Sequence, residues 1–208
     1  VDVLDTASLE IEKRIPVGLN PDNLLVHGDL LYVSNSGGLN FPEADSTISI
    51  VSTILFEELN KVTVGKNPGT LVPSQNGEVL CVVRGNYSDI APSIAVVQNQ
   101  SLEREIDREL VGLTRFDLDL LAVVNENGQT FVRNYDYEND VMSSNHLIDL
   151  SGIETFYGLK YDQNHNRFIV FDANGYTNSG KMLMYNTQGS MVAQYVLFQN
   201  PSSYVWID

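Results

Sequence analysis

Residues 17–21 read Val-Gly-Leu-Asn-Pro, and residues 64–68 repeat them as Val-Gly-Lys-Asn-Pro. A shortened copy, Val-Gly-Leu, occupies residues 111–113, and a degenerate one, Val-Leu-Phe-Gln-Asn-Pro, occupies residues 196–201. The glycines of the first three copies stand at positions 18, 65 and 112, a spacing of 47 residues each time. A turn motif that returns at a period of this length indicates a fold built from one repeated structural unit.

Each period contains four short strand-like runs separated by turn residues, the pattern of a four-stranded antiparallel sheet. The second run of a period, such as residues 30–33 (Leu-Leu-Tyr-Val) or 168–171 (Phe-Ile-Val-Phe), is apolar at consecutive positions. A sheet with one wet face would alternate, so both faces of these strands must be covered. The outermost runs, such as residues 102–107, alternate and carry charge, as an exposed edge does.

Sheets stacked around an axis cover both faces of their central strands. The sequence therefore predicts an all-β fold, a β-propeller of four-stranded antiparallel blades. A β-sandwich is the competing architecture, but it would not repeat its turn motif at this period. The prediction is a single propeller domain, or part of one, over residues 1–208. Its blade units span residues 1–17, 18–64, 65–111, 112–151, 152–198 and 199–208.

These units amount to roughly four and three-quarter blades, because residues 1–17 supply two strands and residues 204–207 supply one. A seven-bladed ring would need about 300 residues at about 45 residues a blade. We therefore expect a fragment of a larger ring, such as a seven-bladed one. A closed five-bladed ring is the alternative, although its composite blade would lack a second strand and leave a ladder unsatisfied.

The composition is acidic, with 27 Asp and Glu against 12 Lys and Arg and a formal net charge of −15. Such a charge repels phosphate groups, which argues against nucleic acid and anionic membranes as partners. No apolar run approaches the roughly 20 residues of a membrane-spanning helix. No signal peptide precedes the first strand. Hydrophobic residues make up 43% of the chain, which is enough for a sizeable core.

Residues 31–35, Leu-Tyr-Val-Ser-Asn, and the Val-Gly-x-Asn-Pro turns carry a family resemblance. They are similar to the Tyr-Val-Thr-Asn signature of YVTN-repeat propellers, which residues 122–125 (Ala-Val-Val-Asn) keep only in eroded form. The resemblance implies an extracellular, cell-surface or periplasmic protein, anchored by lipid in its full-length form. The long loops also resemble those of surface propeller lipoproteins of gut anaerobes, some of which capture cobalamin ahead of an outer-membrane transporter.

The loops after the second strands are long and share a face of the blade with the Asn-Pro turns. They span residues 36–45, 85–92 and 173–180. Long loops on a rigid scaffold are a usual place for binding residues. Amides and aromatic rings would hold a small neutral polar ligand, such as a glycan or a cobamide, by hydrogen bonds and ring stacking. The candidate contacts are Asn35, Asn40, Phe41, Arg84, Asn86, Tyr87, Asn125, Glu126, Asp172, Asn174, Tyr176 and Asn178.

Arg84 stands out among these candidates as one of few cations on an acidic chain. The repeat aligns it with Asn35 of the first blade. Its alternative role is to pair with a neighbouring carboxylate.

Catalytic, cofactor and metal sites are not predicted. His27 and His165 fall in turns of the opposite face and His146 begins an outer strand over residues 146–150, so no His-centred triad is expected. Glu126 and Asp172 are the carboxylates that could act together near the axis. Residues 172–175 start like a calcium loop, but its twelfth position is a leucine, which cannot close the site.

Cys81 lies in the apolar run of residues 79–83 and is interpreted as a buried thiol, not as a nucleophile. The function we expect is non-catalytic capture of a small polar ligand on the loop-rich face. A protein–protein interaction scaffold with a surface protein as partner, such as an outer-membrane transporter, is the alternative. A hydrolase or lactonase-like enzyme ranks third.

Overall fold

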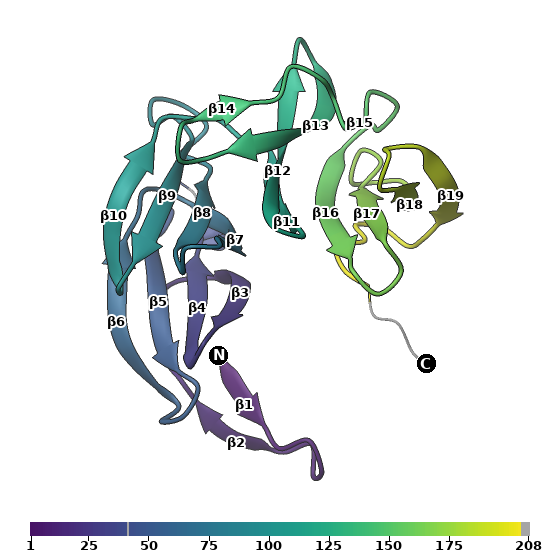
Figure 1. Ribbon diagram of the computed structural model, residues 1–208. Coiled ribbons are helices and arrows are strands. Elements are labelled where there is room, and N and C mark those ends of the chain that lie inside the picture. The colour runs from purple at the N-terminus through teal and green to yellow at the C-terminus, as the bar shows by residue number, and fades with distance from the viewer. Residues whose placement is uncertain (41, 205–208) are drawn as a thin grey trace. The chain divides into compact units, whose positions relative to one another are not determined.

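The computed structural model describes residues 1–40 and 42–204, whose regular secondary structure consists of strands and one short 3-10 helix, η1 (Gly38–Asn40) (Figure 1). The chain divides into two compact units, unit 1 (Val1–Leu110) and unit 2 (Val111–Asp208). Within the described ranges no helix has the length and hydropathy of a membrane span. That residues 1–208 form a single domain stays a prediction.

Unit 1 contains two antiparallel sheets of four strands, preceded by the antiparallel pair β1–β2. The first sheet is the predicted blade of residues 18–64, here called blade 1, and the second is the predicted blade of residues 65–111, called blade 2. The strands are β1 (Asp2–Leu4), β2 (Ile11–Arg14), β3 (Pro21–His27), β4 (Leu30–Asn35), β5 (Thr47–Ser52), β6 (Glu57–Thr63), β7 (Pro68–Pro73), β8 (Val79–Val83), β9 (Ser93–Gln98) and β10 (Ser101–Ile106).

The core of unit 1 lies between the faces of neighbouring sheets. Tyr32 and Ile50 of blade 1 pack in one cluster with Cys81 of blade 2, where β3 and β4 contact β7. On the other face of blade 1, Val33 and Val51 belong to a cluster that includes residues of the β1–β2 pair. Successive residues of β4 therefore point to opposite faces that are both dry. This confirms the stacking predicted from the consecutive apolar positions.

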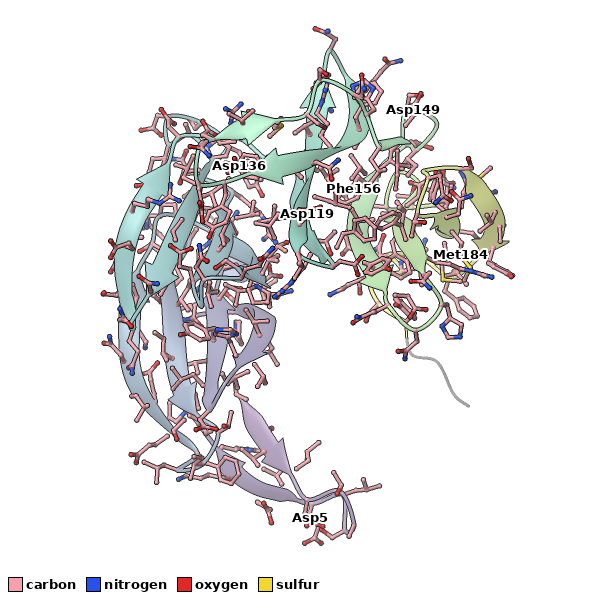
Figure 2. The ribbon with its side chains drawn as sticks, viewed as in Figure 1. Asp5, Asp119, Asp136, Asp149, Phe156 and Met184 are labelled. Atoms are coloured by element: carbon pink, nitrogen blue, oxygen red, sulfur yellow. The ribbon has the colours of Figure 1, made fainter. Side chains whose placement is uncertain are left out.

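Unit 2 contains the two remaining predicted blades, here called blade 3 and blade 4. In Figure 2, Phe156 and Met184 mark β16 and β18 of blade 4. Leu121 of blade 3 and Phe168 of blade 4 share one buried cluster between the two sheets. The strands are β11 (Gly112–Phe116), β12 (Asp119–Glu126), β13 (Gln129–Asp136), β14 (Val141–Met142), β15 (Ile148–Asp149), β16 (Phe156–Asp162), β17 (Arg167–Asp172), β18 (Lys181–Asn186) and β19 (Met191–Val196).

The fourth strand of blade 3 is not the single strand predicted over residues 146–150. Two short strands, β14 and β15, pair with different parts of β13. The segment between them bulges because the Arg133 guanidinium of β13 donates hydrogen bonds to the carbonyls of Ser143 and Ser144, at 2.6 and 2.8 Å. His146 therefore lies in this bulge and does not begin a strand.

The strand predicted over residues 204–207 lies outside the described residues except for Tyr204. The Tyr204 backbone is not in a strand. Its ring packs 6.5 Å from the ring of Phe171, between centroids, against one face of blade 4.

Candidate functional site

The loop after the second strand of a blade lies beside the turn before its first strand. In blades 1, 2 and 4 the residue that opens the loop donates its backbone N–H to a carbonyl of that turn. We call this side the loop edge of a blade. The three hydrogen bonds are Ser36 to Asn20 at 3.1 Å, Arg84 to Asn67 at 3.2 Å and Ala173 to Thr155 at 2.9 Å. The predicted proximity of loop and Asn-Pro turn is confirmed.

Arg84 does not occupy the place of Asn35, and the alignment made from the sequence is wrong by one position. The hydrogen bonds make Arg84 equivalent to Ser36. Asn35 is equivalent to Val83, since they pair with Pro21 and Pro68, the prolines that open the first strands of blades 1 and 2. The shift arises because β4 has six residues and β8 has five.

Three large side chains occupy equivalent places, each three residues after the start of its loop. We call them the loop-tip residues: Leu39, Tyr87 and Tyr176, which are 88%, 73% and 56% exposed. The backbone of Tyr87 has a φ of 58° and that of Tyr176 a φ of 64°. Bulky residues rarely adopt this left-handed conformation, because their Cβ approaches the backbone.

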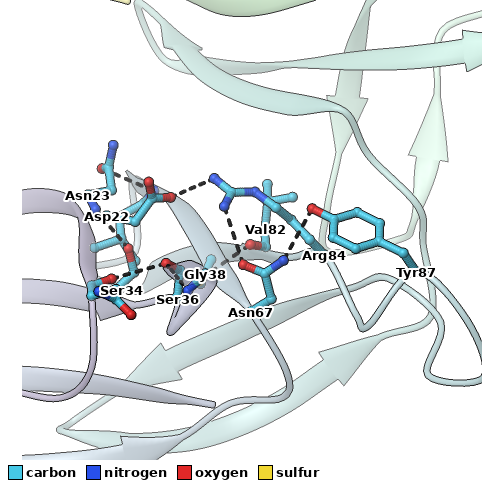
Figure 3. Close-up of polar contacts among 12 residues, drawn as sticks. Asp22, Asn23, Ser34, Ser36, Gly38, Asn67, Val82, Arg84 and Tyr87 are labelled. Atoms are coloured by element: carbon cyan, nitrogen blue, oxygen red, sulfur yellow. Dashed lines mark hydrogen bonds and ion pairs between the residues drawn. The ribbon is translucent and has the colours of Figure 1, made fainter. Parts of the chain in front are cut away.

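Tyr87 is linked to Arg84 by a chain of polar contacts across the loop edge of blade 2 (Figure 3). The Asn67 amide nitrogen donates to the Tyr87 hydroxyl at 3.2 Å, and its oxygen accepts from Arg84 Nη1 at 3.4 Å. Arg84 Nη2 donates to the carboxylate of Asp22 in blade 1 at 2.6 Å. The guanidinium lies where a Cβ on Gly69 would fall, within 2.3 Å of that position. A residue without a side chain at position 69 therefore makes room for Arg84.

Unit 2 presents a second aromatic pair at the loop edge of blade 4. The Tyr176 ring meets Tyr157, on β16, edge to face with a centroid distance of 5.9 Å and an interplanar angle of 80°. Both rings are exposed. Tyr157 is not among the residues predicted from the sequence, because it belongs to a first strand and not to a loop.

Two of the predicted contacts are buried and cannot touch a ligand in this conformation. Asn35 is fully buried, and its amide nitrogen donates to Thr47 Oγ1 at 3.1 Å and Ser49 Oγ at 3.0 Å. Asp172 is also buried, and one carboxylate oxygen accepts the backbone N–H groups of Thr155 and Asn174. Asn35 thus joins the end of its strand to β5, and Asp172 holds the end of β17 against its loop and turn.

Asp45 closes the loop edge of blade 1. One of its carboxylate oxygens accepts the backbone N–H of Leu19 at 2.7 Å, and the other accepts the Thr47 hydroxyl at 2.8 Å. Burial opposes ionisation, but these hydrogen bonds outweigh it and hold the pKa of Asp45 below its ordinary value of 3.8. The ionised carboxylate therefore contributes to the stability of the folded chain.

We expect Asp45→Asn to reduce the pH dependence of folding in acid. A depressed folded-state pKa gives stability that is present above the unfolded-state pKa and is lost as the pH falls through the folded-state pKa. The wild-type chain should therefore be more stable than the variant at neutral pH, and the gap should narrow below about pH 4. Urea unfolding at a series of pH values measures this. A gap that widens in acid would contradict the assignment.

The amides in the loops of blades 2 and 4 mostly serve the loops themselves. The Asn86 side-chain oxygen accepts the backbone N–H groups of Ser88 and Ile90. Asn174 has a φ of 48°, in the position that glycines fill in blades 1 and 2. The Asn178 side chain donates to the Asn174 carbonyl at 3.0 Å. These side chains shape the loops, and their hydrogen-bonding groups are partly occupied.

Asn125 and Glu126 of blade 3 also have partners within the protein. The Asn125 side chain accepts the N–H of Gly128 and caps the tight turn between β12 and β13. Glu126 accepts two hydrogen bonds from Arg133, at 2.9 and 2.8 Å, and these hold the pKa of its carboxyl below the usual range. His146 lies 3.4 Å from the same carboxylate and stacks on a phenylalanine ring. The cluster fastens the bulge of blade 3.

Glu126 and Asp172 have separate sets of partners, so the pairing considered from the sequence is not observed. Asp172 lies 3.5 Å from the ammonium of Lys181. Glu126 binds Arg133. The remaining histidine of unit 2, His165, lies 2.7 Å from Asp162, which caps its turn. In the described part of the chain, no group of three or more His, Cys, Asp or Glu side chains is placed to hold a metal ion.

Part of the acidic excess is used in capping turns. Asp5, Asp136 and Asp149, marked in Figure 2, accept hydrogen bonds from backbone N–H groups two or three residues ahead. Hydrogen bonds from neighbouring residues lower the pKa of each of these carboxyls. Carboxylates with such a role are typical of turns, and they need no ligand to explain them.

Nine of the twelve predicted contacts are exposed or partly exposed, two are buried, and one lies outside the described residues. Arg84, Tyr87 and Tyr176 are described above, and Asn40 is exposed at the end of η1. Phe41 lies outside the described residues. Leu39 and Asn67 are further residues of this edge that sequence reasoning did not select. With the correct register, the repeat would have indicated Leu39. It stands three residues after Ser36, as Tyr87 stands three residues after Arg84.

Cys81 is fully buried, and burial raises the pKa of its thiol to about 12. The interpretation as a buried thiol is confirmed. We expect iodoacetamide at about pH 8 to label the folded protein more than about 100-fold more slowly than the urea-unfolded chain, because the thiolate is the reactive form. Mass spectrometry of timed samples measures the rates. Equal rates would contradict the assignment.

No protein-family model matches the chain, and no curated protein sequence is significantly similar to it. Solved structures are similar in fold. Hydrazine synthase of Kuenenia stuttgartiensis superposes with a TM-score of 0.66 at 15% identity, over 88% of this chain and 56% of that one. The Cps50 (Swd1) β-propeller domain of Myceliophteria thermophila superposes with a TM-score of 0.57 at 13% identity, over 89% of this chain and 58% of that one.

The fold is a β-propeller. A chain of the nidogen/laminin complex matches as well, with a TM-score of 0.57 at 13% identity, over 84% of this chain and 62% of that one. This chain thus spans between 56% and 62% of the length of these three structures. An enzyme and a chain from a protein complex share the fold, and at these identities the likeness extends to the fold alone.

Proposed function

We propose that the loop edges are non-catalytic binding surfaces, each within its own unit, that capture a small polar ligand, such as a glycan or a cobamide-like molecule. The observation that supports this most is the pair of loop-tip tyrosines with left-handed backbones and exposed rings. A bulky residue in this conformation costs about 1 kcal/mol relative to glycine. An exposed ring returns little of that cost to the fold, whereas a ligand that stacks on it would use the ring.

Tyr87 would supply a stacking face and Arg84 hydrogen-bond donors beside it, because Asn67 joins the two side chains. In unit 2 the Tyr157–Tyr176 pair would supply a second apolar platform. The C–H faces of a sugar ring suit such platforms, and the hydroxyl groups suit the neighbouring polar side chains.

The test uses the full chain, a glycan and cobamide panel, and calorimetric titration of each ligand. Tyr87→Asn should weaken binding about tenfold, since an aromatic contact contributes about 1 kcal/mol beyond the area that it buries. Tyr195→Asn on β19 is the matched control, because Tyr195 is exposed at 51% and lies on an outer strand. Binding that Tyr87→Asn leaves intact, or a panel without any ligand, would overturn the proposal.

A further variant, at the second loop-tip tyrosine, separates the ring's role in binding from any role in folding. Tyr176→Asn should change stability by less than about 1 kcal/mol, because Asn tolerates the left-handed conformation and this gain offsets the lost edge-to-face contact with Tyr157. Urea unfolding measures this. A loss of more than about 1 kcal/mol would mean that the ring stabilises the loop, and the strain would then say nothing about a ligand.

A protein-docking scaffold is the second candidate, and Leu39 favours it. This loop-tip residue is the most exposed of the three and has no aromatic face or polar group for a small ligand. If docking is the function, Leu39→Ser should abolish capture of a surface protein partner, such as an outer-membrane transporter, while no panel ligand binds. If ligand capture is the function, Leu39→Ser should change the affinity less than Tyr87→Asn does.

We further propose an extracellular, cell-surface or periplasmic location with a lipid anchor on the full-length protein. The resemblance to YVTN-repeat surface propellers supports it. Protease accessibility in intact cells, compared with lysed cells, tests it. Protection in intact cells whose outer membrane has been made permeable would contradict this location.

A further inference from the structure

The Arg84–Asp22 ion pair is an exposed contact between two blades of unit 1. Arg84 leaves the end of β8 in blade 2, crosses over Gly69 and reaches the first strand of blade 1. Both side chains are 36% exposed. The guanidinium is therefore anchored on one side by protein and open to solvent on the other.

The guanidinium uses only part of its hydrogen-bonding capacity in this arrangement. It has five N–H donors in a planar fork that matches a carboxylate through two parallel bonds. Arg84 donates once to Asp22, through Nη2, and once to Asn67, through Nη1, at a long 3.4 Å. A second carboxylate could approach the fork in the two-bond geometry that Asp22 does not adopt. Exposed ion pairs of this kind contribute little to the free energy of folding, so replacing the Asp22 carboxylate by another carboxylate costs little free energy.

The cations near this edge are not all neutralised by carboxylates. Lys66, in the turn beside the loop, donates its ammonium to the Ala44 carbonyl at 2.8 Å. Asp89, in the same loop as Tyr87, accepts a hydrogen bond from Asn86 at 2.7 Å. Asp45 is engaged with backbone and hydroxyl donors, as described above. Two of the chain's 12 basic residues, Lys66 and Arg84, lie beside the loop of Tyr87, although the protein has a net charge of −15.

We infer that the ligand of this edge carries a carboxylate, as an acidic sugar does, and that this carboxylate binds Arg84 in place of Asp22. Asp22 occupies the anion position in the free protein, and the loop-tip ring of Tyr87 stacks on the sugar beside it. The inference rests on the proposed function and names its ligand class. Asn67 couples the two contacts, because its amide touches both Arg84 and Tyr87.

Matched oligosaccharides test this: oligogalacturonate against the neutral galactose oligomer of the same length, titrated into the full chain. Arg84→Gln should weaken oligogalacturonate binding about tenfold or more and weaken binding of the neutral oligomer clearly less, since a hydrogen bond to a charged group contributes more than one to a hydroxyl. Asp22→Asn should have the opposite effect and tighten oligogalacturonate binding several-fold, because it removes the competing carboxylate. Opposite changes in oligogalacturonate affinity on replacing Arg84 and Asp22 would show that the ligand carboxylate takes the place of Asp22.

Arg14→Gln is the matched control, since Arg14 also forms an exposed ion pair, with Asp2 at 3.5 Å, on β2 of the same unit. It should change neither affinity. Unfolding of each variant in urea checks that the fold is kept. If Asp22→Asn weakens oligogalacturonate binding, or if the charged oligomer does not bind while the neutral one binds through Tyr87, the inference is overturned and the proposed function stands. If neither oligomer nor any other panel ligand binds, the proposed function itself fails.

Discussion

Replacing Asp172 by alanine should destabilise the protein by about 3 kcal/mol, which for a chain of this size is a fall in melting temperature of about 6–12 °C. The side chain is 1% exposed. Its carboxylate accepts the backbone N–H groups of Thr155 and Asn174, at 2.9 and 2.8 Å, and lies 3.5 Å from the Lys181 ammonium. Alanine would leave two donors without an acceptor and one cation without its partner. Because Lys181 is partly exposed, water offsets some of this cost.

Asp172→Asn separates the two contributions. The amide oxygen still accepts the backbone hydrogen bonds, so the loss should fall to about 1–2 kcal/mol, the part that belongs to Lys181. Asp149→Ala is the control, since Asp149 also accepts a backbone N–H but is exposed. Its effect should stay below about 1 kcal/mol. If Asp172→Ala loses no more stability than Asp149→Ala, burial does not determine how much these carboxylates contribute to folding stability.

Gly18→Ala should be about as damaging as Asp172→Ala, at about 2–4 kcal/mol, whereas Gly69→Ala should change stability by less than about 1 kcal/mol. A Cβ on Gly18 would lie 2.5 Å from the Asn35 amide carbon and 2.6 Å from an Asp45 oxygen. Both groups are held by hydrogen bonds and cannot withdraw without breaking them. The Cβ on Gly69 would instead meet the end of the flexible Arg84 side chain, which can swing into solvent.

Urea unfolding of the two glycine variants measures the difference, and each serves as the control for the other. Neither glycine has a positive φ, so the contrast reports packing and not backbone strain. Equal losses of stability in the two variants would mean that Asn35 and Asp45 move away from a new Cβ as easily as the exposed Arg84 side chain does. The Gly69→Ala variant has a second readout, because displacing Arg84 should weaken oligogalacturonate binding while the fold is kept.

The sheets could be predicted because their sequence signals are local and repeated. Apolar residues at consecutive positions, such as Tyr32 and Val33, can be satisfied only where both faces of a strand are covered, and the structure places them in two different clusters. The turn motif marks where blades 1, 2 and 3 begin. The number of strands in each described sheet follows from the spacing of these signals, except in blade 3.

Blade 3 and the register of blade 2 could not be predicted, because both depend on contacts between strands. Arg133 opens a bulge in the fourth strand of blade 3 by bonding to the carbonyls of Ser143 and Ser144, which are ten and eleven residues away. The one-residue difference between β4 and β8 moves Arg84 out of the place of Asn35. No local pattern encodes either event.

The candidate site was located by its loops, but its members were sorted only by their partners. Asn35, Asn174 and Tyr87 look alike in sequence, as polar or aromatic residues after an apolar strand. In the structure Asn35 is buried, Asn174 supplies a left-handed position to its loop, and Tyr87 presents its ring to solvent. The residue type gives the chemistry of a side chain. It does not tell which hydrogen-bond partners that side chain already has in the folded protein.

The sequence by itself determined that this chain folds as stacked four-stranded blades. The reason is that the pattern of apolar residues along each strand is local and can be read without the tertiary structure. Only the tertiary structure decided which side chains face solvent at the loop edges. Hydrogen bonds such as that between Arg84 and Asp22 join residues 62 positions apart, and their formation depends on the packing of one blade against the next.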